Sequence, residues 1–414
     1  MIMAMMKSSN TEWLGDIPTE WDVAQIGNYY ELRNEKVSDY DFEPLSVTMK
    51  GIVTQLATAA KSDDHSNRKL VKKGDFVINS RSDRRGSCGI SPLDGSVSLI
   101  NIVMEPRGEM NPQYYNWLFH TEQFADEFYK WGHGIVDDLW TTRWQEMKKI
   151  LIVAPSPDEQ QAIADYLDET CSKIDEIIAE AKASIDEYKE LKQSVIFEAV
   201  TKGLDKNVEM KQCSVNWLDE IPSTWESIRL KYLLTEINNR SETGTEQPLS
   251  VSQVMGVVPS YMIAVANPTA SYVGQKIVEP NDIVFNKLKA HLGVFFMSKY
   301  HGLVSPDYAV YRTNDKVIPK YLEYLFHTSA CISEFKKYIS GVAEGLMRLY
   351  TSDLFNIRIC LPKVDEQIKI VEYVENKVEL FNSLISEKES LINDLEAYKK
   401  SLIYEVVTGK RRVV

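Results

Sequence analysis

The chain has 414 residues, and most of its recognisable segments occur twice. The run WLGDIPTEW at 13–21 returns as WLDEIPSTW at 217–225, which is 204 residues later. Farther along, LFHT at 118–121 and DEQ at 158–160 return 207 residues later. Two halves of this length make a covalent pseudo-dimer, and internal two-fold symmetry suits a target that also comes in two parts. The repeat is far too long for a solenoid.

Each half is long enough to bury its own hydrophobic core. Short β-rich runs such as 76–78, 98–103 and 150–153 alternate with a helical pattern over 111–128. The second half repeats this plan, with strands expected over 277–285, 303–311 and 355–360 and a helix over 319–338. We therefore expect an α+β fold with two mixed α/β domains in a pseudo-two-fold arrangement, separated by two long antiparallel coiled-coil helices. The expected boundaries are a domain at 1–157, a helix at 158–203, a domain at 204–362, a helix at 363–409 and a tail at 410–414.

The long helices are predicted from their apolar spacing. Each follows a proline and opens with Asp-Glu-Gln, and acidic residues in a first turn complement the helix dipole. The apolar positions recur mostly at intervals of three and four, as in a heptad seam, and neither Gly nor Pro occurs between 158 and 202. The first helix would span about 65 Å at ~1.5 Å per residue. The two helices most simply pair with each other, and the alternative is that each folds back on its own domain. The seam positions are Ile163, Leu167, Ile174, Ile178, Ala181, Ile185, Tyr188 and Val195 in the first helix, and Val371, Val374, Val378, Phe381, Ile385, Lys388, Ile392, Leu395 and Leu402 in the second.

Charge and cysteine content limit the classes of function. The net charge is −13, and the segment 158–203, with 12 acidic and five basic side chains, supplies over half of it. The two large domains are closer to neutral, so they can carry basic patches without a strongly cationic surface. The five cysteines form no Cys-x-x-Cys pair, which favours a reducing, cytoplasmic location without a zinc site. No apolar run is long enough for a membrane span.

Catalytic motifs are not apparent. The chain has no phosphate-binding loop followed by Lys-Ser/Thr and no Gly-x-Gly-x-x-Gly fingerprint. His120 and His327 occupy equivalent positions, but each follows Leu-Phe in a helical pattern, so a position at a helix end or in the core is favoured over metal ligation. We therefore predict no catalytic residue, no metal site and no bound cofactor in this chain.

Two polar, basic loops are the main candidates for function. NSRSDRRG at 79–86 and NKLKAHLG at 286–293 follow equivalent strands, and they keep Asn and Gly while the residues between them differ. Arg can contact guanine bidentately, Asn can do the same for adenine, and Lys or Arg can neutralise phosphates. One scaffold that reads two sequences would have this pattern, whereas the alternative is a solvated charged hairpin. The predicted DNA-contacting residues are Asn79, Arg81, Ser82, Arg84 and Arg85 in the first loop and Asn286, Lys287, Lys289 and His291 in the second.

Weaker candidates lie in two other pairs of equivalent segments. The turns after Thr48 and Ser252 contribute Lys50 and Gln253. The segments 139–144 and 346–350 contribute Arg143, Arg348 and Tyr350, which could equally be packing residues.

Taken together, these motifs resemble the specificity subunits of type I restriction-modification systems. The resemblance rests on Trp-Leu-x-x-Ile-Pro-x-x-Trp at the start of each half, Pro-Leu-Ser-Val at 44–47 and 248–251, the Asn-containing loop after a strand, and Pro-x-x-Asp-Glu-Gln before each long helix. It covers essentially the whole chain, and the duplicated order of the elements makes it specific.

The resemblance implies that each half is a target-recognition domain followed by a spacer helix. The domains would read the two parts of a split double-stranded DNA site, and the helices would bind two methyltransferase subunits and set the spacer length. Catalysis would then belong to partners: modification subunits that use S-adenosylmethionine, and restriction subunits that use ATP and magnesium. A coiled-coil scaffold that pairs two protein partners without reading DNA is the alternative. A fused restriction-methyltransferase is a second alternative, but the chain has no room for a catalytic domain.

Overall fold

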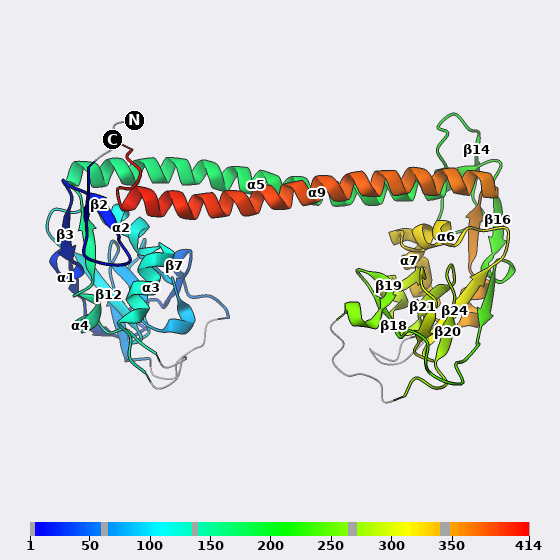
Figure 1. Ribbon diagram of the computed structural model, residues 1–414, viewed down its shortest axis with the longest axis horizontal. Helices are drawn as coiled ribbons and strands as arrows, with labels where there is room; N and C mark the ends of the chain where they lie inside the picture. The colour runs from blue at the N-terminus through cyan, green and yellow to red at the C-terminus, as the bar shows by residue number, and fades with distance from the viewer. Residues whose placement is uncertain (1–4, 59–64, 135–139, 264–270, 340–347, 414) are drawn as a thin grey trace. The chain divides into compact units, whose positions relative to one another are not determined.

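The computed structural model describes residues 5–58, 65–134, 140–263, 271–339 and 348–413 (Figure 1). The chain forms two compact units. Unit 1 comprises Met1–Lys182 and Glu389–Val414, and unit 2 comprises Ala183–Lys388. Both units therefore contain one globular part together with a portion of each long helix. The domain boundaries expected from the sequence divide the chain differently and stay a prediction.

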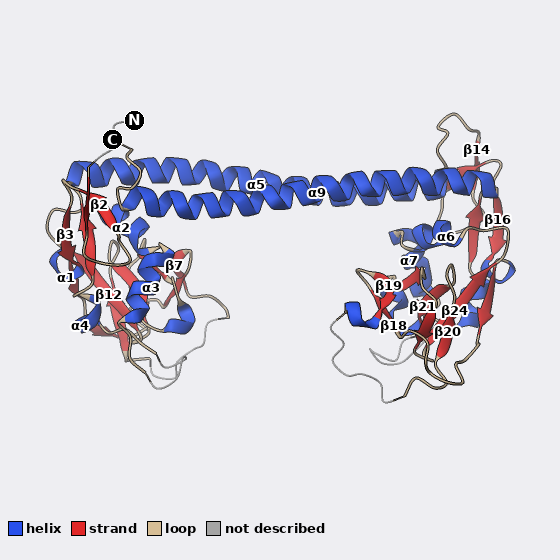
Figure 2. Ribbon diagram, viewed as in Figure 1, coloured by secondary structure: helices blue, strands red, loops and turns tan. Residues whose placement is uncertain are grey.

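Unit 1 contains short antiparallel sheets with small helices beside them (Figure 2). Its largest sheet has the order β10-β9-β12-β4, and smaller sheets are formed by β11-β8-β5, β6-β7, β13-β3 and β1-β2. The elements are β1 Met6–Ser8, β2 Asp16–Pro18, β3 Asp22–Gln25, α1 Ile26–Tyr29, β4 Tyr30–Leu32, β5 Lys36–Val37, β6 Leu45–Thr48, β7 Gly51–Thr54, β8 Arg68–Val71, β9 Phe76–Asn79, η1 Ser82–Arg84, β10 Cys88–Ile90, β11 Gly95–Val97, β12 Asn101–Pro106, α2 Pro112–Phe119, α3 Glu122–Lys130, α4 Trp144–Met147 and β13 Leu151–Ala154.

Unit 2 repeats this plan. Its largest sheet, β17-β24-β21-β22, corresponds to the largest sheet of unit 1, and two-stranded sheets are formed by β14-β15, β16-β25, β18-β19 and β20-β23. The elements are β14 Met210–Gln212, β15 Glu220–Pro222, β16 Glu226–Arg229, η3 Leu230–Tyr232, β17 Leu234–Ile237, β18 Leu249–Ser252, β19 Gly256–Pro259, η4 Ser260–Met262, β20 Lys276–Val278, β21 Ile283–Asn286, η5 Lys287–Leu292, β22 Phe295–Met297, β23 Gly302–Val304, β24 Tyr308–Thr313, α6 Pro319–Phe326, α7 Ser329–Lys337, α8 Thr351–Asn356 and β25 Arg358–Leu361.

Aromatic side chains form the core between the largest sheet and the helices of unit 1. Phe76 on β9 packs edge-on against Phe119 on α2, with ring centroids 5.0 Å apart, and Tyr30 and Phe124 contact the same ring. Unit 2 also has an aromatic core, in which Phe295 contacts Phe285 and Phe326, the equivalent of Phe119. Buried aromatic rings contribute large apolar areas, so this packing stabilises the strands that lead into the candidate loops.

The helical pattern over 111–128 is two helices rather than one, and the pattern over 319–338 divides in the same way. In each unit a threonine, Thr121 or Thr328, lies between the two helices and accepts a hydrogen bond from a backbone N–H in the next turn. A side-chain cap of this kind begins a new helix at that residue. The strand predicted over 355–360 also starts later than expected, because Phe355 belongs to α8.

The long helices are α5, Pro157–Lys202, and α9, Val364–Val407. They run antiparallel within each unit. In unit 1 the Lys399 ammonium lies 2.6 Å from the Asp175 carboxylate, and Lys182 lies 3.9 Å from Glu396. In unit 2 the Tyr188 and Phe381 rings are neighbours. The predicted pairing of the two helices is confirmed, although the buried position at the end of the first seam is Ile196 rather than Val195. No helix in the described ranges combines the length and apolarity that a membrane crossing requires.

The Asp-Glu-Gln motif attaches the start of each long helix to a globular part. The Trp21 indole donates to Glu159 over 3.2 Å, and the equivalent Trp225 indole donates to Glu366 over 3.1 Å. These contacts explain why the tryptophan and the glutamate recur together in both halves.

The glutamine of the same motif is buried. Gln160 is 1% exposed; its side chain accepts from the Asn111 backbone N–H and donates to the Pro155 carbonyl, both over 2.8 Å. Gln367 is 0% exposed and makes the equivalent bonds to Ile318 and Pro362. Each glutamine therefore joins the strand before the long helix to the segment before α2 or α6.

The far end of each long helix is attached as well. The Tyr114 hydroxyl donates to the Val407 carbonyl over 2.7 Å in unit 1, and the equivalent Tyr321 hydroxyl donates to the Val200 carbonyl over 2.8 Å in unit 2. Gly409 follows α9 with φ +73°, and a Cβ there would lie 2.5 Å from Pro18. Only glycine fits this left-handed, crowded position.

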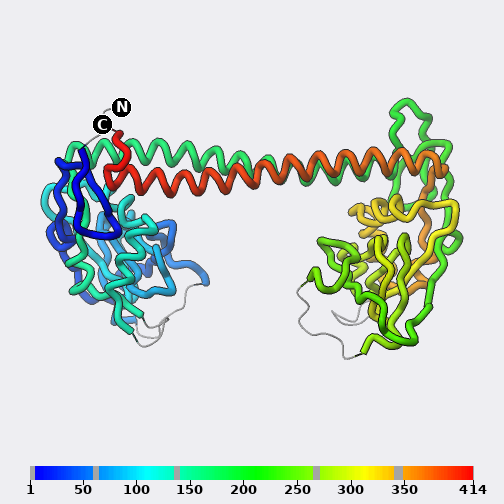
Figure 3. Tube along the Cα trace, in the orientation of Figure 1, coloured from blue at the N-terminus to red at the C-terminus, as the bar shows by residue number. Residues whose placement is uncertain are grey.

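The last residues of the chain contact the first strands of unit 1 (Figure 3). Lys410 donates to the Leu14 carbonyl over 2.6 Å. The Arg412 guanidinium pairs with Glu20 and, over 3.2 Å, with Glu159. In unit 2 the corresponding connection is covalent, because Gly203 continues into β14. Ion pairs thus help to connect the end of α9 to the first strands of unit 1, whereas a continuous peptide segment connects the end of α5 to β14 in unit 2.

We predict that Gln160→Ala lowers the free energy of unfolding by about 1–3 kcal/mol, because the buried Pro155 carbonyl and the part-buried Asn111 N–H would lose their partner. Gln367→Ala should have an effect of the same size in unit 2. The neighbouring Gln161→Ala, at an exposed position, is the control and should change stability little. Urea unfolding of the three variants measures the difference, and equal stabilities for Gln160→Ala and Gln161→Ala would contradict the anchoring role of the buried amide.

Candidate nucleic-acid interface

Asn79 and Asn286 shape the two candidate loops. In unit 1 the Asn79 side-chain oxygen accepts from the Arg81 backbone N–H over 3.0 Å, and in unit 2 the Asn286 oxygen accepts from the N–H groups of Leu288 and Lys289. Both asparagines are buried. An asparagine that accepts local N–H bonds stabilises a turn, which explains why it recurs while the residues after it differ.

A second predicted segment lies beside each loop. In unit 1 Thr142 N–H donates to the Ser80 carbonyl over 3.0 Å, and Arg81 forms a bridge with Thr141. In unit 2 Leu349 N–H donates to the Lys287 carbonyl over 3.1 Å. The structure thus brings the candidates of 139–144 and 346–350 next to the loop candidates. Residues 139, 346 and 347 lie outside the described ranges.

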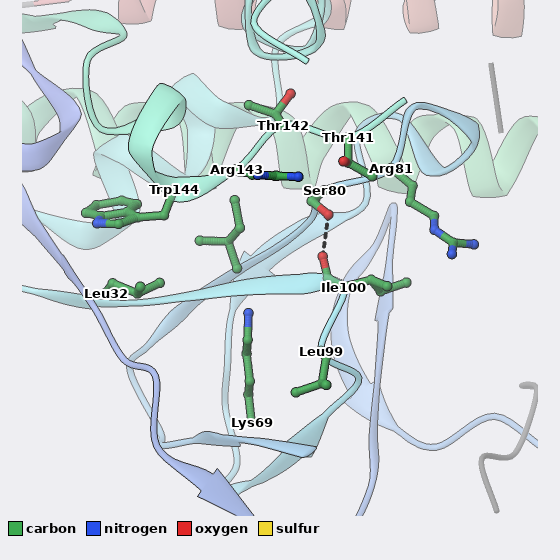
Figure 4. Close-up of a pocket in the computed structure, with 11 residues that line it drawn as sticks. Leu32, Lys69, Ser80, Arg81, Leu99, Ile100, Thr141, Thr142, Arg143 and Trp144 are labelled. Carbon is green, nitrogen blue, oxygen red and sulfur yellow. Dashed lines mark hydrogen bonds between the residues drawn. The ribbon is translucent and has the colours of Figure 1, made fainter. Parts of the chain in front are cut away.

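A pocket of about 350 Å³ opens where the loop of unit 1 meets this segment (Figure 4). Its lining combines apolar Leu32, Leu99 and Ile102 with Trp144 and with the basic Lys69, Arg81 and Arg143. Lys69 points toward the other lining side chains in Figure 4, whereas the Arg81 guanidinium extends away from them. A lining of apolar and basic side chains can accept the edge of a flat, partly apolar group such as a base.

The arginines of unit 1 differ in their partners. Arg84 lies 3.6 Å from Asp83, and Arg85 is paired with Asp126. No ion pair to Arg81 or Arg143 occurs within the described ranges, and the Nε atom of Arg81 is buried there without a hydrogen-bond partner. Of these four arginines, Arg84 and Arg85 therefore have a carboxylate partner among the described residues, and Arg81 and Arg143 do not. Ser82, the remaining polar candidate of this loop, is half-buried within η1.

The basic side chains of unit 2 divide similarly. Lys287 lies 3.6 Å from Glu236, whereas Lys289 is exposed and forms no ion pair with a described residue. His291 is half-buried in η5. Beyond the loop, Arg348 is half-buried and Tyr350 is exposed.

The two turn candidates also lie near the loops. In unit 2 the Gln253 side chain donates to the Leu292 carbonyl at the end of η5 over 3.3 Å. In unit 1 Lys50 is exposed at the β6–β7 turn, and the neighbouring Met49 methyl lies within contact distance of the Gly86 position. Loop, turn and adjacent segment thus form one surface in each unit, which we call the loop surface.

Two lysines at the base of the loop surface were missed in the sequence. Lys69 on β8 donates to the Asn101 carbonyl over 2.7 Å, and Lys276 on β20 donates to the equivalent Tyr308 carbonyl over 2.8 Å. Burial lowers the pKa of both ammonium groups. They are exactly 207 residues apart, so the repeat offset that identified the loops could also have identified them.

The two equivalent histidines connect helices to the loop strands. His120 ends α2 with its Nε2 3.1 Å from the Cys88 carbonyl, and His327 ends α6 with its Nε2 3.0 Å from the Gly293 carbonyl. The predicted position at a helix end is confirmed. Within the described ranges no group of three His, Cys, Asp or Glu side chains could bind a metal ion.

Comparison with known proteins finds similarity to one kind of protein. Residues 222–394 match the type I restriction modification DNA specificity domain. Over 418 residues the chain is 22% identical to the type I restriction enzyme MjaVIII specificity subunit of Methanocaldococcus jannaschii, with 94% of each protein covered. A protein named as the MjaX specificity subunit, from the same organism, is 20% identical over 412 residues, with 91% of each covered.

Two solved structures have a similar fold. One is a chain from work on complex assembly and conformational transition of the type I R-M system; its TM-score is 0.73 at 15% identity, with 95% of this chain and 99% of that chain covered. The other is the HsdS subunit of Thermoanaerobacter tengcongensis, with a TM-score of 0.59 at 17% identity and coverage of 95% and 98%. At these identities the likeness shows a shared fold.

His327 should make the stability of unit 2 depend on pH. Burial lowers its pKa below the ordinary value, so the unfolded chain binds the proton more tightly than the folded chain does. The free energy of unfolding of unit 2 should therefore be unaffected by His327 above the unfolded-state pKa of about 6.5, and it should fall as the pH drops below this value. His327→Gln, which stays neutral, should show a smaller loss of Tm between pH 7 and pH 5. Parallel Tm curves for the two proteins would argue against this role.

Proposed function

We infer that this chain is a DNA specificity subunit of a type I restriction-modification system, in which each unit reads one part of a divided double-stranded DNA site. Family, fold and the duplicated motifs agree on this assignment. The specificity subunit is the non-catalytic component of such systems. The cofactors of the complete system, namely S-adenosylmethionine, ATP and magnesium, would therefore bind to the modification and restriction subunits.

The observation that carries the proposal is that the same loop surface is built twice with different side chains. The backbone of both loops is set by a buried asparagine and by a bond to the adjacent segment. The polar side chains differ between the units: the half-buried Arg81 and the exposed Arg143 in unit 1, and the exposed Lys289 and Tyr350 in unit 2. A conserved scaffold with variable polar tips fits two readers of two different short sequences.

The partners of the arginines suggest different roles for them. We assign base contacts in the first half-site to Arg81 and Arg143, because no described carboxylate neutralises them and both line the pocket. Arg84 and Arg85 already have carboxylate partners, so they suit phosphate contacts, in which the negative phosphate competes with Asp83 or Asp126.

In unit 2 Lys289 is exposed and forms no ion pair with a described residue, and we assign it to the second half-site together with Tyr350 and Arg348. Lys287 and His291, being half-buried, would support the loop from below. Lys50 and Gln253 lie at the edges of the loop surface and suit contacts to the DNA backbone.

The helices are proposed as the binding sites for two methyltransferase subunits. The chain carries a net charge of −13, which opposes tight DNA binding by this chain alone. Complex formation with partners that add their own DNA contacts would offset this repulsion. The acid-rich surface of α5 suits a polar or basic groove on such a partner.

We predict that Arg81→Ala and Arg143→Ala each relax recognition of the first half-site and leave the second half-site unchanged. Loss of a bidentate base contact costs about 1–3 kcal/mol of discrimination at one position. The control is Arg107→Ala. Arg107 is an exposed arginine that directly follows the last residue of β12, at the opposite end of this strand from Asn101. Long-read mapping of methylated adenines in cells that express the complete system with each variant reports both half-sites.

The outcomes separate the role of the chain from the role of the residues. A methylated bipartite motif that is identical in all three variants would contradict the assignment of Arg81 and Arg143 but not the specificity function. A methylation pattern that does not change when the whole chain is replaced by a relative with different loops would contradict the specificity function itself.

A further inference from the structure

Unit 2 contains two cysteines whose sulfur atoms face each other. The Sγ atoms of Cys213 and Cys360 are 2.9 Å apart, although the residues are 147 positions apart in the sequence. Cys213 follows β14 and Cys360 lies on β25, the strand that leads into α9. A disulfide bond is ~2.05 Å long, so the two atoms need to approach by only about 0.9 Å to reach bonding distance.

The equivalent residues of unit 1 cannot do this chemistry. Ser9 corresponds to Cys213, because both backbone N–H groups donate to the carbonyl six residues later. Ser9 donates to the Gly15 carbonyl, and Cys213 donates to the Asp219 carbonyl. Val153 corresponds to Cys360, because both lie at the third position of equivalent strands. The fold therefore does not require cysteine at either place, and the sulfur pair is a feature of unit 2 alone.

We propose that Cys213 and Cys360 are a redox modification site, which forms a reversible disulfide on reaction with a small-molecule disulfide. In the first step a Cys213 thiolate attacks one sulfur of the small disulfide, and a mixed disulfide and one free small thiol result. The Cys360 thiolate then attacks the Cys213 sulfur and releases the second small thiol. Two protein thiols are oxidised, one disulfide is reduced to two thiols, and the protons pass to the leaving thiolates.

Exposure decides the order of the two steps. Cys213 is half-buried and can be reached from solvent, whereas Cys360 is 1% exposed. Burial is the main cause that raises the pKa of the Cys360 thiol, and the hydrogen bond to Cys213 is the second cause. A thiol with a raised pKa is a poor first nucleophile. The other three cysteines, Cys88, Cys171 and Cys331, are buried.

The bond would close a long loop around the globular part of unit 2. It would connect Cys213, directly after β14 at the start of the globular part, to Cys360 on β25, the last strand before α9. Because the closed loop is long, the disulfide removes much conformational freedom from the unfolded chain. Oxidation should therefore raise the Tm of unit 2 on the order of 5–10 °C.

The test uses the full-length protein after incubation with oxidised glutathione, with dithiothreitol-treated protein as reference. After alkylation and trypsin digestion, mass spectrometry should find peptide 212–229 linked to peptide 359–363 in the oxidised sample only. Thermal unfolding of the same samples gives the Tm shift. The double variant Cys213→Ser, Cys360→Val carries the residues that unit 1 already has at these places, so it should fold, and its Tm should not respond to oxidation.

Three results would overturn the proposal. One is glutathione retained on Cys213 while Cys360 stays a free thiol. Another is a disulfide between two molecules, visible as a dimer without reductant. The third is a Tm shift in the double variant equal to that of the parent protein.

Discussion

Attachment of each long helix at both ends is the constraint on which the rest of the structure depends. At the start, a tryptophan indole and a buried glutamine connect the Asp-Glu-Gln turn to the globular part. At the end, a tyrosine hydroxyl satisfies a carbonyl of the last helical turn. Each globular part therefore contacts the start of one helix and the end of the other. Buried hydrogen bonds of this kind are costly to leave unmade, so the helix direction relative to its own globular part is strongly specified.

The same constraint explains how the side chains of the loop surface can vary without loss of the fold. The anchoring residues lie at the helix ends and in the aromatic core, whereas the loop surface is formed by turns after β9, β21 and the short hairpins. The asparagines and histidines that shape these turns recur in both units, and the exposed Arg, Lys and Tyr side chains do not. Stability and recognition are thus assigned to different residues.

Much of this could be predicted from the sequence because repetition marks what the fold requires. The 204- and 207-residue offsets identified the two halves, the loops and the long helices, and the heptad spacing predicted their pairing. The internal ends of the short helices could not be predicted in the same way, since the caps at Thr121 and Thr328 act through local hydrogen bonds that do not alter the apolar period. The half-buried Lys69 and the buried Lys276 were overlooked because a charged residue in a strand is normally read as solvent-exposed. The ion pair of Arg85 with Asp126 depends on a tertiary contact between residues 41 positions apart and leaves no pattern in the sequence, whereas Arg84 pairs with its neighbour Asp83.

The contact between the C-terminal residues and the first strands has a practical consequence. In unit 2 a continuous peptide connects the end of α5 to β14, whereas in unit 1 the corresponding connection consists of Arg412, Lys410 and their partners near the N-terminus. A peptide bond is indifferent to ionic strength, but an ion pair at the surface is screened by salt. The two repeated halves of the chain therefore differ in how their ends are secured, and an affinity tag fused after Val414 would begin three positions after Arg412.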